Sequence, residues 1–194
     1  MAHKSGFVSI VGSPNVGKST LMNQLVGEKL SIVTDKAQTT RHRILGIVND
    51  EDHQVVFSDT PGVVNSAYKL HDNMMEYVNS SIQDADILLF VTDTVETEMN
   101  HKQTLERIQN LDIPVLCLIN KMDMSDQKMV ARKLAYWKRR LPKAVIFPIS
   151  ALHGFGIEGV WAEIKSHIPE SPPYFEKDAI TDRPMRFFIS EIIR

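Results

Sequence analysis

The sequence predicts an α/β fold in which helices cover both faces of a doubly wound, mostly parallel sheet. Short apolar runs rich in Val, Ile, Leu and Phe alternate along the 194 residues with longer runs in which apolar residues recur at helical spacing. Motifs containing glycine, asparagine or aspartate directly follow several apolar runs, at the strand ends where open sheets of this class bind ligands. The length suits one domain with a sizeable core.

The first half of the chain shows this alternation from its beginning. The apolar run Phe7–Val11 predicts a strand, and helical spacing of Leu and Met residues follows in Gly17–Val26. Two further runs, Ile44–Val48 and Val55–Ser58, predict strands. A helical pattern over Leu70–Asp84 completes this half.

The second half repeats the alternation. Ile87–Thr92 and Val115–Ile119 are nearly continuous apolar runs, which is typical of strands that are buried on both faces. Between them, His101–Leu111 has helical spacing. The remaining predicted elements are a helix over Asp126–Leu141, a strand over Val145–Ile149 and a helix over Ile157–Ile168.

The segment GSPNVGKST matches the phosphate-binding loop pattern G-x-x-x-x-G-K-[ST] at every fixed position, and it lies between a predicted strand and a predicted helix. Its glycines let backbone N–H groups converge on phosphates, and the helix N-terminus adds partial positive charge. An ordinary glycine-rich turn is the alternative, which the complete match in this context disfavours. Lys18 is expected to reach the β- and γ-phosphates, and Ser19 to bind Mg²⁺. The predicted contacts are Gly12, Ser13, Pro14, Asn15, Val16, Gly17, Lys18, Ser19 and Thr20.

Asn120, Lys121 and Asp123, in the motif NKMD, follow a buried strand and predict recognition of guanine. A fixed carboxylate at Asp123 can accept hydrogen bonds from both the N1–H and the exocyclic amine of guanine, which adenine does not offer together. The aliphatic stem of Lys121 can cover one face of the base. The Asn120 amide can brace the loop beneath it. Alone this motif is usually a polar turn, but here it follows a phosphate loop and ends a strand.

Two short motifs complete the predicted site, each at a strand end. DTPG places a carboxylate near the metal and the N–H of its glycine near the γ-phosphate. SAL places the N–H of its alanine near the guanine carbonyl. The residues are Asp59, Thr60, Pro61 and Gly62 in the first motif and Ser150, Ala151 and Leu152 in the second.

Together, the segments GSPNVGKS, KAQTTRHR, DTPG, NKMD and SAL resemble the translation-factor-related GTPases and, within them, the Era family of bacterial ribosome-assembly GTPases. Residues 35–44 resemble the first switch of that family, and residues 174–183 and 190–194 resemble its passage into an RNA-binding KH domain. The resemblance implies a three-layer P-loop GTPase (G) domain. Its six-stranded sheet would be mostly parallel, with the second strand antiparallel at one edge.

The resemblance also implies roles for individual residues. It favours Thr40 over Thr39 as the threonine that joins Ser19 and Asp59 in binding Mg²⁺, and it implies that Asn15 helps bind K⁺. We therefore expect slow, Mg²⁺-dependent hydrolysis of GTP to GDP and phosphate, stimulated by K⁺. The residues expected to act in catalysis are Lys18, Thr40 and Gly62. Val63 stands where some GTPases orient water with glutamine, and a valine side chain cannot hydrogen-bond.

A segment with three prolines, residues 169–173, predicts the end of the G domain. We assign residues 1–171 to that domain, and residues 172–194 to a linker and the beginning of a C-terminal KH-type RNA-binding domain. The apolar stretch Met185–Ile193 has no predicted cover in this chain. By resemblance, the full protein binds small-subunit ribosomal RNA and the 30S subunit, mainly through that second domain, and assists subunit assembly.

The composition agrees with an intracellular, near-neutral protein. The formal net charge is −2, so no global basic field marks nucleic-acid binding by this piece. The basic run Trp137–Lys143 could touch RNA, but a charged C-terminal helix turn is the favoured interpretation. One cysteine, Cys117, excludes an internal disulfide and suits a reducing cytoplasm. We expect a cytoplasmic monomer, with peripheral association at the inner face of the cell membrane left open.

Two alternative functions remain at this point. The first keeps the chemistry and changes the client, because related GTPases act in large-subunit assembly or tRNA modification. The second is a nucleotide-dependent interaction module with negligible hydrolysis. An ATP-dependent kinase is disfavoured, because NKMD predicts guanine recognition.

Overall fold

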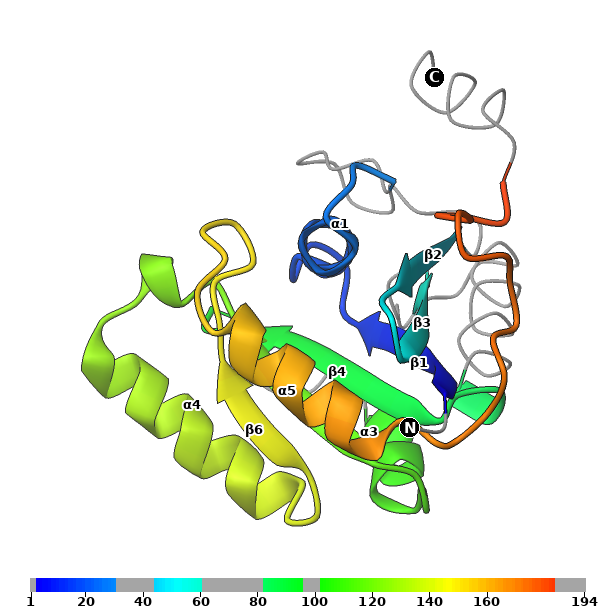
Figure 1. Cartoon of the computed structure of the whole chain (residues 1–194). Coiled ribbons are helices and arrows are strands. Elements are labelled where there is room, and N and C mark those ends of the chain that lie inside the picture. Colours follow the sequence, from blue (N-terminus) through cyan, green and yellow to red (C-terminus); the bar gives the residue numbers. More distant parts are fainter. Residues whose placement is uncertain (1–2, 31–43, 61–81, 96–101, 184–194) are drawn as a thin grey trace, which may run out of the picture.

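The computed structural model describes residues 3–30, 44–60, 82–95 and 102–183 (Figure 1). Several residues singled out in the sequence lie outside these ranges, as does most of the predicted helix Leu70–Asp84. Those residues are Thr39, Thr40, Pro61, Gly62, Val63 and the apolar stretch Met185–Ile193.

One six-stranded sheet runs through the described part of the chain, with strand order β2-β3-β1-β4-β5-β6. Each pair of neighbours is parallel except β2 and β3, which are antiparallel, and β2 forms one edge. The mostly parallel sheet with an antiparallel second strand is therefore confirmed. The strands are β1 (Lys4–Gly12), β2 (Ile44–Asn49), β3 (His53–Asp59), β4 (Ile87–Asp93), β5 (Val115–Asn120) and β6 (Val145–Pro148).

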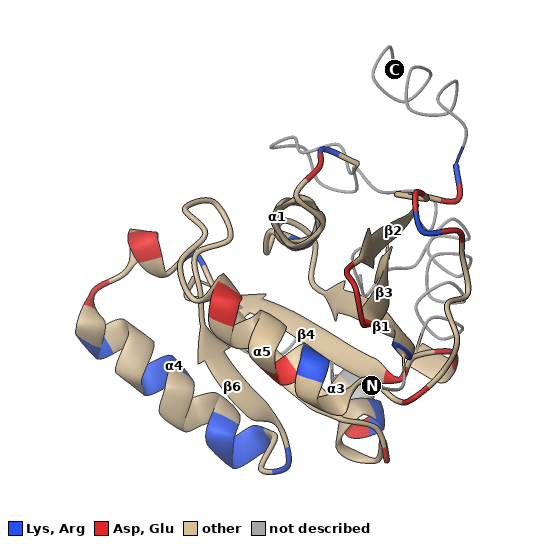
Figure 2. Cartoon of the chain, viewed as in Figure 1, with Lys and Arg blue, Asp and Glu red and all other residues tan. Residues whose placement is uncertain are grey.

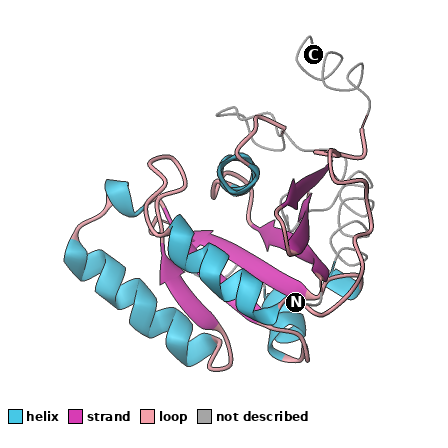
Figure 3. Ribbon diagram, in the orientation of Figure 1, coloured by secondary structure: helices cyan, strands magenta, loops and turns pink. Residues whose placement is uncertain are grey.

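Helices cover both faces of the sheet and complete three layers (Figures 1 and 3). Side chains of α1 and α5 pack into one apolar cluster, whereas α3 and α4 contribute to a separate cluster on the opposite face. Within the described residues, none of the helices has the length and apolarity needed to cross a membrane. The described helices are α1 (Lys18–Val26), α3 (Lys102–Gln109), α4 (Gln127–Arg140) and α5 (Ile157–His167), with a short 3₁₀ turn, η1 (Met122–Met124).

Strand β4 explains why the central runs are apolar throughout. Ile87, Leu89 and Val91 face the cluster under α1 and α5, whereas Leu88 and Phe90 face the cluster under α3 and α4. Successive strand residues point to opposite faces, so a strand covered on both sides needs apolar residues at every position.

Cys117 in β5 is fully buried, as the sequence predicted. Burial raises the pKa of its thiol, because the thiolate would lose its hydration. The Cys117 thiol is therefore inert at neutral pH and acts as a small apolar core group.

The segment after α5 packs against the sheet, although nothing in the sequence indicated that the linker predicted from residue 172 would do so. It forms a strap, defined here as residues 169–183, that runs beside β1 and β3 to the β2 edge (Figure 1). Backbone N–H groups of Ser5 and Ile47 donate to the carbonyls of Pro169 and Ile180 at 3.1 and 2.9 Å. The Phe7 and Tyr174 rings lie 4.9 Å apart. The domain boundary at residue 171 stays a prediction, but hydrogen bonding to the sheet continues beyond it.

Gln54 fastens the strap to β3. Its side chain is fully buried, and its Oε1 accepts hydrogen bonds from the N–H groups of Tyr174 and Phe175 at 2.6 and 2.9 Å. Its Nε2 donates to the Phe175 carbonyl at 2.8 Å and to Asn49 Oδ1 at 2.7 Å. One amide thus satisfies both backbone groups of Phe175, which no apolar side chain could do.

We predict that Gln54→Leu lowers the free energy of unfolding by about 1–3 kcal/mol, because it leaves two partly buried N–H groups of the strap without their acceptor. Urea unfolding followed by circular dichroism measures this change. Gln127→Leu is the matched control, because Gln127 is exposed in the first turn of α4. Equal effects of the two substitutions would show that the Gln54 contacts to the strap add nothing to stability.

Candidate nucleotide-binding site

The predicted site residues gather at the carboxyl ends of the parallel strands. The phosphate loop follows β1, Asp59 ends β3, and Asn120 ends β5. Register brings them together, because Ile10 pairs with Asp59 and Asp93 pairs with Asn120. The loop after β6 reaches the same edge, where the Ala151 N–H donates a hydrogen bond to Asn120. This is the edge at which open α/β sheets bind ligands.

Two glycines of the phosphate loop lie where no side chain fits. Gly12 has φ +157°, and a Cβ there would lie 2.1 Å from the Val91 carbonyl oxygen. Gly17 has φ +96°, and a Cβ there would lie 2.3 Å from the Asn120 side-chain nitrogen. The fixed glycines of the pattern are therefore required by positive φ and by close packing, against a backbone carbonyl at Gly12 and against the Asn120 side chain at Gly17.

The loop holds its lysine close to its own backbone. Lys18 is 7% exposed, and its Nζ donates to the Ser13 carbonyl at 2.7 Å. A nearly buried ammonium held at the phosphate loop is the arrangement expected for stabilising phosphate charge. Asn15 is exposed with φ +62°, a conformation that asparagine tolerates better than most residues. That backbone role exists whether or not its side chain also binds K⁺.

Ser19 and Asp59 form the predicted metal pair. Ser19 Oγ donates to Asp59 Oδ2 at 2.9 Å, and Asp59 is fully buried at the end of β3. A hydroxyl and a carboxylate are hard oxygen ligands, so the pair fits Mg²⁺. Bound there, Mg²⁺ would offset negative charge on phosphate oxygens. The next residue, Thr60, donates to the Ile10 carbonyl at 2.7 Å and so ties the end of β3 to β1.

Asn120 joins the phosphate loop to the loop after β6. Its Nδ2 donates to the Val16 carbonyl at 2.8 Å, and its Oδ1 accepts from the Ala151 N–H at 2.9 Å. The side chain is 3% exposed. The sequence assigned the Ala151 N–H to the guanine carbonyl, whereas in the structure it bonds to Asn120. The brace predicted for Asn120 thus reaches two loops.

Ser150 orients the carboxylate that is predicted to recognise guanine. Its hydroxyl donates to Asp123 Oδ1 at 2.5 Å, while His153 Nε2 lies 3.9 Å from Asp123 Oδ2. The hydrogen bond from Ser150 holds the pKa of Asp123 below its usual range, because it stabilises the charged form. Asp123 therefore stays ionised as the pH falls into the mildly acidic range, and its acceptor function persists there.

Asp93 belongs to the site but was missed in the sequence. Lys121 has φ +61°, and its Nζ forms an ion pair with Asp93 Oδ2 at 2.8 Å. This pair fixes the aliphatic stem that the sequence assigns to one face of the base. Thr94 extends the link by donating to the Lys121 carbonyl at 3.4 Å and accepting a hydrogen bond from Ser125. The available signal was the position of Asp93, at the carboxyl end of a central strand.

The other predicted contacts divide into three groups. Val16 is buried, whereas Pro14 and Thr20 are half-buried in the loop and the first turn of α1. Leu152 is 71% exposed, and its contact with the nucleotide stays a prediction. Thr40, Pro61 and Gly62 lie outside the described residues.

The fold and the site together define a guanine-nucleotide-binding domain of the P-loop class. A family model described as "50S ribosome-binding GTPase" matches residues 7–121. This match spans more than half of the chain, and the chain belongs to this family of GTPases.

Within the family, the chain is similar to proteins named Era. It is 45% identical to the chloroplastic GTPase ERA1 of Zea mays and 43% identical to GTPase Era of Geotalea uraniireducens, over 99% and 98% of its length. The solved structure of Era in complex with MgGDPNP and nucleotides 1506–1542 of 16S ribosomal RNA matches with a TM-score of 0.90 at 39% identity. The resemblance to the Era family found in the sequence is thus confirmed.

The matches also locate this chain within its relatives. The chain spans 47% of the length of the maize protein, 65% of the Geotalea protein and 66% of the solved Era chain. In that structural match, 98% of the present chain is covered. Elongation factor SelB of Methanococcus maripaludis matches with a TM-score of 0.68 at 21% identity, which shows the shared fold alone.

We predict that Asp123→Asn weakens GTP binding and gains affinity for xanthosine nucleotides, whose exocyclic carbonyl needs a donor. Each lost charge-assisted hydrogen bond should cost about 1.5–3 kcal/mol. Calorimetric titration with GDP and xanthosine diphosphate measures both changes. Asp126→Asn is the control, because Asn keeps the helix cap that Asp126 provides to Met129 N. An Asp123→Asn variant with unchanged GDP affinity would refute the assignment.

Proposed function

We propose that this chain is a GTP-binding and GTP-hydrolysing switch domain. The observation that carries the proposal is the Asn120 amide, which joins the phosphate loop to the loop after β6, where Ser150 orients the guanine-recognising carboxylate of Asp123. A site built for phosphates alone would not need that link. The solved Era structures, one with MgGDPNP and one of the Aquifex aeolicus protein with GDP and AlF₄⁻, support the same ligand class.

In the proposed reaction, water attacks the γ-phosphate, and the residues of this chain position and stabilise the charge. Lys18 and the loop N–H groups hold the β- and γ-phosphates. Asp123 and Lys121 hold the base and Asn120 braces the loops around it, so that the phosphates bind in one fixed position. Ser19, Asp59 and Thr40 would hold Mg²⁺. The Val63 side chain has no atom that can accept the proton of the attacking water, so it cannot serve as a general base.

For the full-length protein, we propose binding to small-subunit ribosomal RNA and a role in assembling that subunit. The solved Era complex contains 16S ribosomal RNA nucleotides, and it matches this chain over 98% of its length. The family description instead names the 50S particle, which keeps large-subunit assembly as the alternative client. We assign most RNA affinity to a KH-type domain after residue 194, because the net charge of this chain is −2. The buried free thiol of Cys117 suits a reducing cytoplasm.

Unstimulated GTP turnover is predicted to be slow, on the order of 10⁻⁴ to 10⁻² s⁻¹, the range of comparable switches without an activator. We expect K⁺ to raise the rate over Na⁺, because a cation at Asn15 would offset transition-state charge. Phosphate release in matched KCl and NaCl buffers measures both. No turnover in either salt would favour the interaction module instead.

The same assay separates the two roles of Asn15. Asn15→Gly keeps the φ +62° backbone accessible and removes the side-chain amide, so it should abolish the difference between K⁺ and Na⁺ without unfolding the loop. Asn15→Ala would add backbone strain and is the poorer variant. A K⁺ effect that survives in Asn15→Gly would return Asn15 to its backbone role alone.

A further inference from the structure

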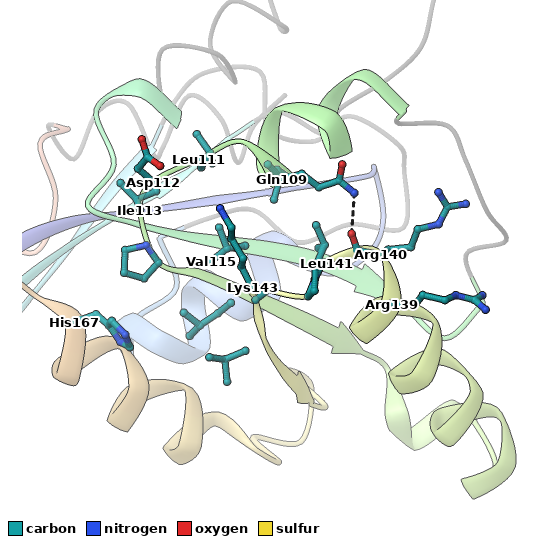
Figure 4. A pocket seen from close by; sticks show the side chains of 16 residues that line it. Gln109, Leu111, Asp112, Ile113, Val115, Arg139, Arg140, Leu141, Lys143 and His167 are labelled. Carbon is teal, nitrogen blue, oxygen red and sulfur yellow. Dashed lines mark hydrogen bonds between the residues drawn. The ribbon is translucent and has the colours of Figure 1, made fainter.

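A hollow lies at the amino end of strand β5, whereas the nucleotide site lies at the carboxyl ends of the strands. It has a volume of about 590 Å³ and is bounded by the end of α3, the end of α4, the beginning of β6 and the end of α5 (Figure 4). It opens beside Val115, the first residue of β5, whereas Asn120 at the other end of β5 belongs to the nucleotide site. Five residue steps along a strand separate the two sites by roughly 17 Å.

The floor of this hollow is apolar and its rim is basic. Ile108, Leu111, Ile113, Val115, Leu141 and Val145 contribute apolar surface. Arg139 and Arg140 at the end of α4 and Lys143 after it line the hollow, with both guanidinium groups directed outward from its floor, and Asp112 is the one acidic residue among its lining (Figure 4). Blue residues gather at the end of α4 and in the loop after it (Figure 2).

These cations have no carboxylate partner in the described part of the fold. Arg139, Arg140 and Lys143 are exposed, and none of them forms an ion pair with a described residue. Arg140 lies over the Tyr136 ring, 5.5 Å from its centroid, and its carbonyl accepts from Gln109 Nε2 at 2.8 Å. Cations suit the C-terminal turn of α4, but that effect does not extend to Lys143 beyond Pro142.

We propose that this hollow binds single-stranded RNA, with phosphates on Arg139, Arg140 and Lys143 and a base against the apolar floor. Guanidinium groups bind phosphate oxygens in pairs. An unpaired base stacks on guanidinium planes and loses water from its faces against aliphatic side chains, and neither contact requires a particular sequence. The hollow lies within the size range of small-ligand pockets, so it can hold one nucleotide. The inference rests on the proposed function. A domain of a protein that binds ribosomal RNA meets RNA phosphates at its surface, and for this reason RNA is chosen over an acidic peptide as the ligand.

The contact is expected to be weak and electrostatic. For single strands, the logarithm of affinity falls with the logarithm of salt concentration with a slope of about −0.7 for each neutralised phosphate. Three phosphates therefore give a slope of about −2. Such a contact would orient the G domain on RNA that another domain holds tightly, and it leaves the nucleotide site free to cycle.

The test is fluorescence anisotropy of a labelled single-stranded oligouridylate of about 12 nucleotides, titrated with the GDP-bound 194-residue chain at several salt concentrations. Arg139→Gln with Lys143→Gln removes two rim cations. Lys128→Gln with Arg132→Gln removes the same charges from exposed positions earlier in α4. A third variant, Val145→Asp, places a carboxylate on the 40% exposed floor residue without removing a cation.

We expect the rim variant to make the salt slope shallower by about 1.4, the share of two phosphates, and the control pair to leave it unchanged. Val145→Asp should also weaken binding. Equal slopes in the rim and control variants, or no binding by the unsubstituted chain at low salt, would overturn the proposal. So would rim-dependent binding of phosphatidylglycerol vesicles or polyglutamate without binding of RNA.

GDP titration of the same samples keeps this test separate from the proposed function. Normal GDP affinity in all variants shows that they are folded, so that a failure in the RNA titration counts against the hollow alone. Loss of GDP binding by the unsubstituted chain would instead overturn the proposed nucleotide switch.

Discussion

The buried amide of Asn120 is the contact on which the nucleotide site depends. It holds the Val16 carbonyl in the phosphate loop and the Ala151 N–H in the loop after β6, so two loops that are 104 and 31 residues away along the chain share one side chain. Gly17 is required beneath it, since a Cβ there would meet its nitrogen at 2.3 Å. The amide can serve both loops because it carries a donor and an acceptor on one rigid plane.

The sheet places the residues that Asn120 connects. Parallel register brings Asp59 beside β1, where Ser19 reaches it, and brings Asp93 beside Asn120, where it pairs with Lys121. Apolar packing on both faces of β4 and β5 keeps this edge rigid, which suits a site that must hold base and phosphates in one register. The strap adds a second constraint at the β2 edge, where Gln54 fixes the segment leading out of the domain.

Much of the fold could be predicted because its signals are local. The apolar runs of β1 and β5 lie within a few residues of the observed strands, and the phosphate loop matched a pattern with one physical meaning. The Asp93–Lys121 pair and the Gln54 contacts to Phe175 could not be predicted in this way. Each joins distant residues through tertiary packing, which neither periodicity nor turn chemistry encodes. The hollow could not be predicted either, because its lining comes from separate elements. Its basic run also fits an ordinary helix terminus.

Hydrogen exchange of the nucleotide-free chain, compared between wild type and Asn120→Ala, tests the central claim most directly. If Asn120 braces both loops, the substitution should speed amide exchange in the phosphate loop around Val16 and in the loop around Ala151, while the core of β4 stays protected. Asp123→Ala removes a hydrogen bond to Ser150 in the loop after β6 but no contact to Val16, so it should leave the phosphate loop unchanged. Faster exchange around Ala151 alone would contradict the account, because Asn120 would then support one loop instead of coupling two.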